Sequence, residues 1–124
     1  MLLEISFAEI NKLVAAKGQS RFTLGGDGAN LVLSIKILLG TARLRLRQIE
    51  TSLNRVVFSH KGDNLLGSSI SMGGGLASFF KIPDFVSIDT KHVTIYWDKL
   101  LPQISIHSSR ISVKGSSLLV DLEI

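Results

Sequence analysis

The sequence predicts an α+β domain in which two helices pack on a long, bent antiparallel sheet. Three observations support this fold class. Apolar residues first recur at helical spacing, then alternate with polar residues through most of the chain, and clusters of Gly, Asp and Asn separate the alternating segments. No repeat, low-complexity tract or linker divides the 124 residues, so residues 1–124 are expected to form a single domain.

The first predicted element is an amphipathic helix from about Phe7 to Lys17. Ser6 and Glu9 have the spacing of a capping box, in which each side chain satisfies a free backbone donor. Gly18 is a typical residue just after a helix ends. The apolar side chains recur at helical spacing: Phe7, Ile10, Leu13 and Val14. We expect this face to pack on the sheet.

Alternating segments then predict strands and hairpins. The turn signals "GGDGAN" and "HKGDN" bound a meander of antiparallel strands, and a single helical turn from Asp98 to Pro102 interrupts a later pair of hairpins. The strand segments are residues 21–24, 31–38, 42–49, 54–60, 85–89, 93–97, 103–113 and 117–124.

A second, Gly-rich helix is predicted within residues 64–83. Gly73–Gly75 disfavour a helix interior by about 3 kcal/mol relative to alanine, so we expect a break there. The mean hydropathy of +0.34, with only 19% charged residues, implies more apolar surface than one small core buries. This segment is expected to border an apolar groove or an interface between copies, lined by Leu65, Met72, Leu76, Phe79 and Phe80.

The amino-acid composition excludes several classes of function. The chain has no cysteine, which excludes disulfides and thiol catalysis. No window approaches the 18 or more apolar residues of a membrane-spanning helix, and no basic leader precedes the apolar residues at the start. We therefore expect a cytoplasmic protein, or a membrane-associated or exported one if an upstream anchor was removed.

Motifs for catalysis and cofactors are incomplete, so we expect a protein that is not an enzyme and binds no cofactor or metal. The glycine clusters lack both the third glycine of a dinucleotide site and the lysine of a phosphate-binding loop. His60, His92 and His107 lie in separate segments without the spacing of a metal-binding helix. The aspartates mostly stand at positions typical of turns and helix caps.

The segment "TARLRLRQIE" places three arginines on one side of a strand, because strand residues two apart share a face. Arg43, Arg45 and Arg47 are either the solvated face of the sheet or a contact for an anionic surface. The net charge of +4 favours anionic partners. Nucleic acid is disfavoured, because no aromatic residues interleave with the arginines. Tyr96 and Trp97 fit either a membrane interface or the rim of a core.

The order of elements resembles that of bacterial domains similar to the tubular lipid-binding superfamily, which includes bactericidal/permeability-increasing protein. The resemblance is carried by "FAEINKLVAAKG", "FVSIDTKHVTIYWDKLLP" and "ISVKGSSLLVDLEI". It implies a bent sheet around a helix, with an apolar groove for lipid. The expected function is a non-enzymatic lipid-binding or membrane-associated module. The alternative is a structural or interaction protein that forms a homo-oligomer through its apolar surface.

Overall fold

A computed structural model of the chain describes residues 1–18, 21–37, 40–64, 66, 68, 84–89 and 91–124. These residues are 61% strand and 15% helix. The strands are β1 (Leu2–Ser6), β2 (Phe22–Asp27), β3 (Asn30–Ile37), β4 (Gly40–Ser52), β5 (Arg55–Gly62), β6 (Val86–Ile88), β7 (His92–Tyr96), β8 (Ser108–Lys114) and β9 (Ser117–Glu123). The helices are α1 (Phe7–Ala16) and α3 (Trp97–Leu100).

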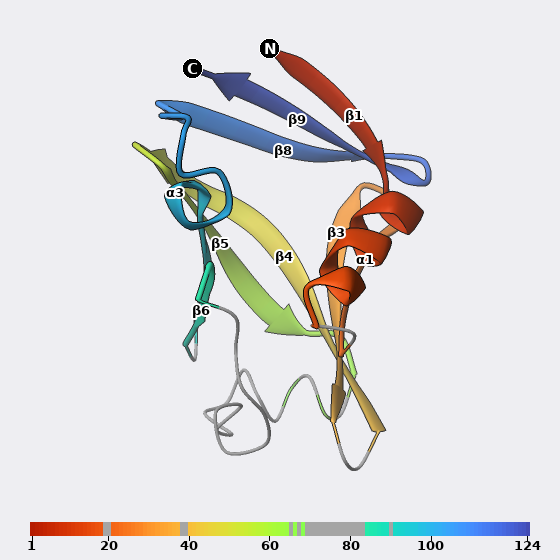
Figure 1. The fold of residues 1–124 in the computed structure, drawn as a ribbon. Helices are drawn as coiled ribbons and strands as arrows, with labels where there is room; N and C mark the ends of the chain where they lie inside the picture. Colours follow the sequence, from red (N-terminus) through yellow and green to blue (C-terminus); the bar gives the residue numbers. More distant parts are fainter. Residues whose placement is uncertain (19–20, 38–39, 65, 67, 69–83, 90) are drawn as a thin grey trace.

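The strands form two antiparallel sheets. One has six strands in the order β2-β3-β4-β5-β7-β6, and the other has three strands in the order β1-β9-β8. Figure 1 shows the smaller sheet lying across the top of the larger one, which curls into half a barrel. The meander and the hairpins expected from the alternating sequence are confirmed by β2 to β5, by β6 with β7 and by β8 with β9.

The predicted α+β fold class is wrong, because strands rather than helices cover the core side of the large sheet. Strand β8 contacts β3, β4 and β5. The segment Leu2–Ser6, which was not among the predicted strands, pairs with β9. The predicted Gly-rich helix lies almost entirely outside the described residues.

Helix α1 forms where the sequence predicts it, and the Glu9 N–H donates to the Ser6 hydroxyl at 3.1 Å. Its predicted packing on a sheet face is wrong. Only Phe7 is buried along this helix, and Leu13 is 63% exposed. The helix instead lies beside the edge strand β2, where the Asn11 side chain accepts from the Leu24 N–H at 2.7 Å and donates to the Leu24 carbonyl at 3.0 Å.

One contiguous apolar core fills the space between the two sheets. The large sheet supplies most of it, and the small sheet closes it with alternating residues of β9. The largest fully buried side chains are Phe58, Ile35, Leu44, Ile106, Val56, Val93 and Ser109. Burying an aliphatic or aromatic side chain stabilises the fold by about 1.5–3 kcal/mol, so this core is a major source of stability.

Side chains of β4 join the two sheets. The pairing of β4 with β5 has a bulge between Gln48 and Glu50. The Gln48 amide donates to the Ser109 carbonyl at 2.8 Å and accepts from the Ile111 N–H at 2.9 Å. The Thr51 hydroxyl accepts from the Ser109 N–H at 2.9 Å. These bonds satisfy the N–H and C=O of Ser109 and the N–H of Ile111 on the outer edge of β8, which would otherwise lack partners there.

The turn between β4 and β5 is fixed by Asn54, which has a φ of 57°. The Asn54 N–H donates to the Ile106 carbonyl at 2.7 Å, and its side-chain oxygen accepts from the Ile106 N–H at 2.9 Å. The Trp97 N–H donates to the Asn54 carbonyl at 2.8 Å. Trp97 is partly buried against the core and donates through its ring to the Ser109 hydroxyl at 3.0 Å, so it occupies a core rim.

Candidate functional site

The candidate site is the outer face of the large sheet, meaning the face turned away from the core. Residues of β4 alternate between the two faces, which places the predicted arginine row outside. The buried residues are Ala42, Leu44 and Leu46, and the exposed ones are Arg43, Arg45 and Arg47. The chain therefore presents three guanidinium groups to solvent from one strand.

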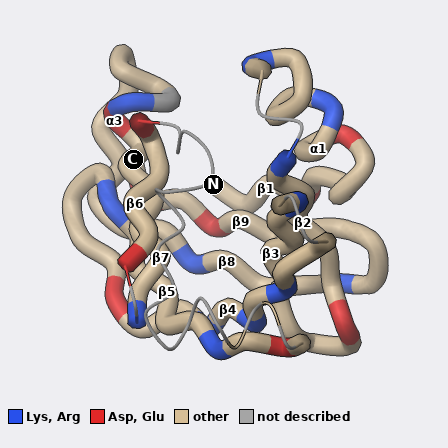
Figure 2. Tube along the Cα trace, turned by 90° about the horizontal axis from the view of Figure 1, so that it is seen from below, with Lys and Arg blue, Asp and Glu red and all other residues tan. Residues whose placement is uncertain are grey.

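Neighbouring strands extend this row. Lys61 on β5 lies directly opposite Arg45, and Lys36 on β3 lies opposite Thr41, one alternation from Arg43. Arg55 is also exposed and follows the outward alternation of β5. We call the whole set the basic face: Lys36, Arg43, Arg45, Arg47, Arg55 and Lys61. Figure 2 shows several basic residues on and beside β4.

The positive charges of the basic face are only partly neutralised by acidic side chains. Like charges directly opposite one another on paired strands are destabilising, and Arg45 with Lys61 is such a pair. Arg45 also forms an ion pair with Asp63, at 2.8 Å between Nη2 and Oδ1. Within the described part of the chain, neither Arg43 nor Arg47 has an ion pair. An anionic partner would therefore relieve repulsion as well as add attraction.

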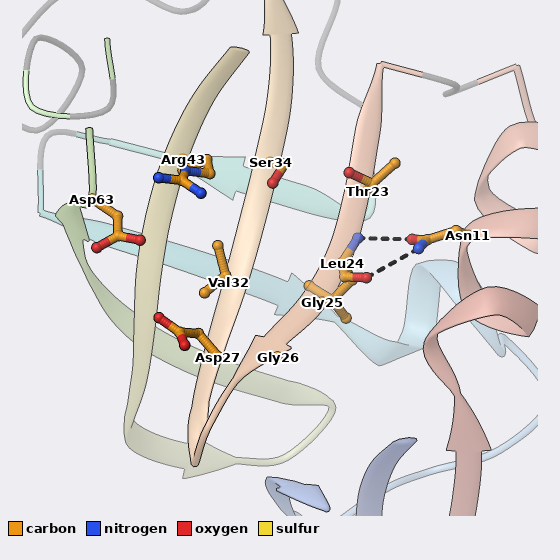
Figure 3. Close-up of a pocket in the computed structure, with 10 residues that line it drawn as sticks. All are labelled: Asn11, Thr23, Leu24, Gly25, Gly26, Asp27, Val32, Ser34, Arg43 and Asp63. Carbon is orange, nitrogen blue, oxygen red and sulfur yellow. Dashed lines mark hydrogen bonds between the residues drawn. The ribbon is translucent and has the colours of Figure 1, made fainter. Parts of the chain in front are cut away.

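An open cleft of about 460 Å³ borders the basic face at β2, β3 and β4. Figure 3 shows that Arg43 and Ser34 point into it from adjacent strands, with Thr23 beyond them on β2. Asp27 and Asp63 also line the cleft, so its wall carries both signs of charge. This mixture favours water and polar groups over an apolar ligand.

Residues 63 and 64 hold the β4 backbone at the cleft. The Asp63 N–H donates to the Arg43 carbonyl at 2.8 Å. The Asn64 side-chain oxygen accepts from the Arg43 N–H at 3.1 Å, and its amide donates to the Thr41 carbonyl at 2.7 Å. These bonds continue the β4 pairing past the end of β5. The first arginine of the row is thus anchored at its backbone while its side chain stays exposed.

After the arginines, the exposed side chains at the end of β4 and in the following turn include large apolar ones. Ile49, in the bulge, is 51% exposed, and Leu53, in the turn that follows, is 58% exposed. Leu101 and Ile104, in the segment between α3 and β8, are 42% and 40% exposed. Asn54 holds that segment against the turn through its bonds to Ile106. Exposed aliphatic side chains thus gather near the turn at the end of the arginine strand.

Two of the three histidines lie beside one carboxylate. His60 is buried and donates through Nε2 to the Asp89 carbonyl at 2.6 Å. His92 lies 3.6 Å from the Asp89 carboxylate. Backbone N–H groups of Lys91 and His92 donate to that carboxylate and hold the pKa of Asp89 below its usual value. This arrangement closes the β6–β7 hairpin, and no group of described residues has the composition of a metal site.

The predicted apolar groove cannot be placed: Leu65, Met72, Leu76, Phe79 and Phe80 lie outside the described residues. None of the described helices is long and apolar enough to cross a membrane. Comparison with known proteins finds no matching family model, no matching curated protein and no matching solved structure.

Alternation in the sequence predicts the arginine row but not the basic residues around it. Lys36, Arg55 and Lys61 are isolated basic residues in their own strands, and only strand register brings them together. The sequence "RVVFSHKG" shows the outward alternation of β5, but the bulge between Gln48 and Glu50 shifts the register, so the length of the β4–β5 turn alone would not place Lys61 opposite Arg45. The exposure of Leu53 was also predictable, because it is a large apolar residue within a predicted turn.

Proposed function

We propose that this protein is a non-enzymatic module that binds anionic membrane surfaces through the basic face. The observation that carries the proposal is the register of Arg45 against Lys61 within the row from Arg43 to Arg47. It concentrates exposed positive charge on one side of a rigid sheet. A cation held near an anionic bilayer contributes about 1 kcal/mol to binding, so the three arginines supply about 3 kcal/mol.

A bilayer fits this surface better than a nucleic acid. Single-stranded nucleic acids bind to platforms on which bases stack against aromatic rings. The outward-facing residues of β3, β4 and β5 include none of the aromatic type. Ile49 in the arginine strand and Leu53 in the turn that follows it instead supply exposed aliphatic groups, and such groups gain free energy by entering the apolar part of a bilayer.

Sedimentation with vesicles tests the proposal. The variant Arg43→Gln/Arg45→Gln/Arg47→Gln is compared with the charge-matched variant Lys12→Gln/Lys17→Gln/Lys114→Gln, whose lysines are exposed on α1, after α1 and on β8. We expect the arginine variant to bind phosphatidylserine vesicles roughly a hundredfold more weakly at low salt. The lysine variant should bind almost as the wild type does.

Two further measurements complete the test. Binding of the wild type should fall steeply as salt rises, and phosphatidylcholine vesicles should not bind it. Equal losses in the two variants would mean that net charge, rather than the basic face, drives the association. Stronger binding to a single-stranded oligonucleotide than to the vesicles would replace the membrane with a nucleic acid as the partner.

A further inference from the structure

The two sheets have four edge strands, and three of them are protected. The edge of β2 is covered by the Asn11 side chain, and the edge of β8 by Gln48 and Thr51. Strand β6 has only three residues, and short edge strands resist pairing with other chains. Strand β1 is the exception: no described side chain bonds to its outer backbone, and Figure 1 shows it as the outermost strand of the small sheet.

The register of β1 determines which of its backbone groups face outward. Met1 and Leu122 exchange both backbone hydrogen bonds, at 2.6 and 2.7 Å. In an antiparallel pair such residues alternate with pairs whose N–H and C=O groups point away from the partner strand. Leu2, opposite Asp121, and Glu4, opposite Leu119, therefore direct two N–H and two C=O groups away from β9.

The β1 sequence has few of the features that normally guard an edge, and Glu4 is its one charged residue. The strand "LLEIS" contains no proline, lysine or bulge, and Leu2 is 67% exposed. An edge with free backbone groups and an exposed leucine is a template for strand addition. The contrast with β2 and β8 shows that this fold satisfies its other long edges with amide and hydroxyl side chains.

We propose that β1 pairs antiparallel with β1 of a second copy of this chain, so that the two small sheets become one six-stranded sheet. The outward-facing backbone N–H and C=O groups of Leu2 and Glu4 lie symmetrically on either side of Leu3. Leu2 would exchange both hydrogen bonds with the partner's Glu4, and the reverse pair would do the same. The two copies of Leu3 then meet at the two-fold axis.

The occupant is a second copy because this register is self-complementary. One arrangement satisfies the outward groups of both strands, as a two-fold interface requires. It places no like charges directly opposite one another, because the only charged residue of β1 faces a leucine. Asp121, next to Leu2 on the same face, already lies opposite Arg110 of β8. This interface is separate from the basic face and does not depend on the proposed membrane binding.

A charge exchange tests the register in sedimentation equilibrium. The wild type should dimerise at micromolar concentrations. Leu2→Glu places glutamates directly opposite one another twice, so we expect dissociation to become about tenfold easier. Adding Glu4→Lys to Leu2→Glu converts both contacts into opposite charges and should restore the dimer. Both substitutions are at exposed positions, but Leu2→Glu also lies opposite Asp121 of its own chain, so circular dichroism and thermal unfolding must show that each variant is folded under the conditions of the sedimentation experiment.

A proline substitution provides an independent check. Glu4→Pro removes only an outward N–H and leaves the bonds to β9 in place, so it should yield folded monomers. A wild type that remains monomeric at about 100 µM, well above the Kd of a stable homodimer, would overturn the proposal. A dimer that survives Leu2→Glu and Glu4→Pro would also overturn it, because the copies would then meet elsewhere.

Discussion

Gly26 and Val113 lie so close that Gly26 has no room for a side chain. A Cβ atom placed on Gly26 would lie 2.7 Å from Cγ1 of Val113 and 3.3 Å from the Phe7 ring. The three residues come from β2, β8 and the start of α1, so this contact is where the two sheets and the helix meet. The glycine in the first turn signal thus serves close packing between layers.

This contact predicts that Gly26→Ala destabilises the protein by about 1–3 kcal/mol, because overpacking forces neighbouring groups to shift. Gly25→Ala is the matched control, since a Cβ at Gly25 would meet no atom within 4 Å. Urea unfolding followed by circular dichroism compares the two variants. Equal stability of both would show that the sheets do not approach each other at Gly26 as described.

The Gln48 amide predicts a second effect on stability. Replacing Gln48 with leucine keeps a side chain of similar size but removes the bonds to Ser109 and Ile111. Leaving such partly buried backbone groups unpaired should cost about 1–3 kcal/mol. Hydrogen exchange should also show faster exchange of the Ile111 N–H, while the Leu24 N–H, which donates to Asn11, stays protected. Unchanged protection of the Ile111 N–H would argue against the hydrogen bonds of Gln48 between the two sheets.

The Asp89 carboxylate predicts a pH dependence. Its pKa is lowered mainly by the Lys91 N–H, then by the His92 N–H, with a smaller contribution from the charges of His92 and His60. A carboxyl whose pKa is lower in the folded state stabilises the fold above its unfolded pKa, here near 3.8. That stabilisation is lost as the pH falls through the folded pKa.

We therefore expect Asp89→Ala to be less stable than the wild type at neutral and mildly acidic pH. The difference should begin to shrink as the pH falls below about 4, where the carboxyl of the unfolded chain becomes protonated, and it should be lost as the pH passes the lower pKa of the folded state. Asp89→Asn keeps an acceptor oxygen and should retain part of the stability at neutral pH. Thermal unfolding across this pH range provides the measurement, and a difference that persists unchanged at low pH would contradict the assignment.

Most individual strands were predictable because their alternation is local. The segment from Ala42 to Ile49 shows both faces of β4 directly in the sequence, and Ser6 with Glu9 shows where α1 begins. The fold class was not predictable in the same way. Whether Leu118 and Val120 join the large sheet or cover it depends on contacts between residues far apart in the chain.

The candidate site shows the same division. Alternation alone placed Arg43, Arg45 and Arg47 on one side, whereas Lys61 joined them only through the register of β4 with β5. Gln48 follows the inward alternation of Ala42, Leu44 and Leu46, whereas Thr51 turns towards β8 only because of the bulge, which leaves no clear signal in the sequence. The hydrogen bonds that join β4 to β8 were therefore not predictable from the sequence.

A fluorescent probe on the basic face tests the central claim most directly. The chain contains no cysteine, so a single introduced cysteine can be labelled without background. Thr41 is exposed and follows the outward alternation of Arg43 on β4, whereas Ser112 is exposed on the outer side of the small sheet. The label at Thr41→Cys should shift to shorter wavelength with phosphatidylserine vesicles, and the label at Ser112→Cys should not. A shift at Ser112→Cys without one at Thr41→Cys would contradict membrane binding through the basic face.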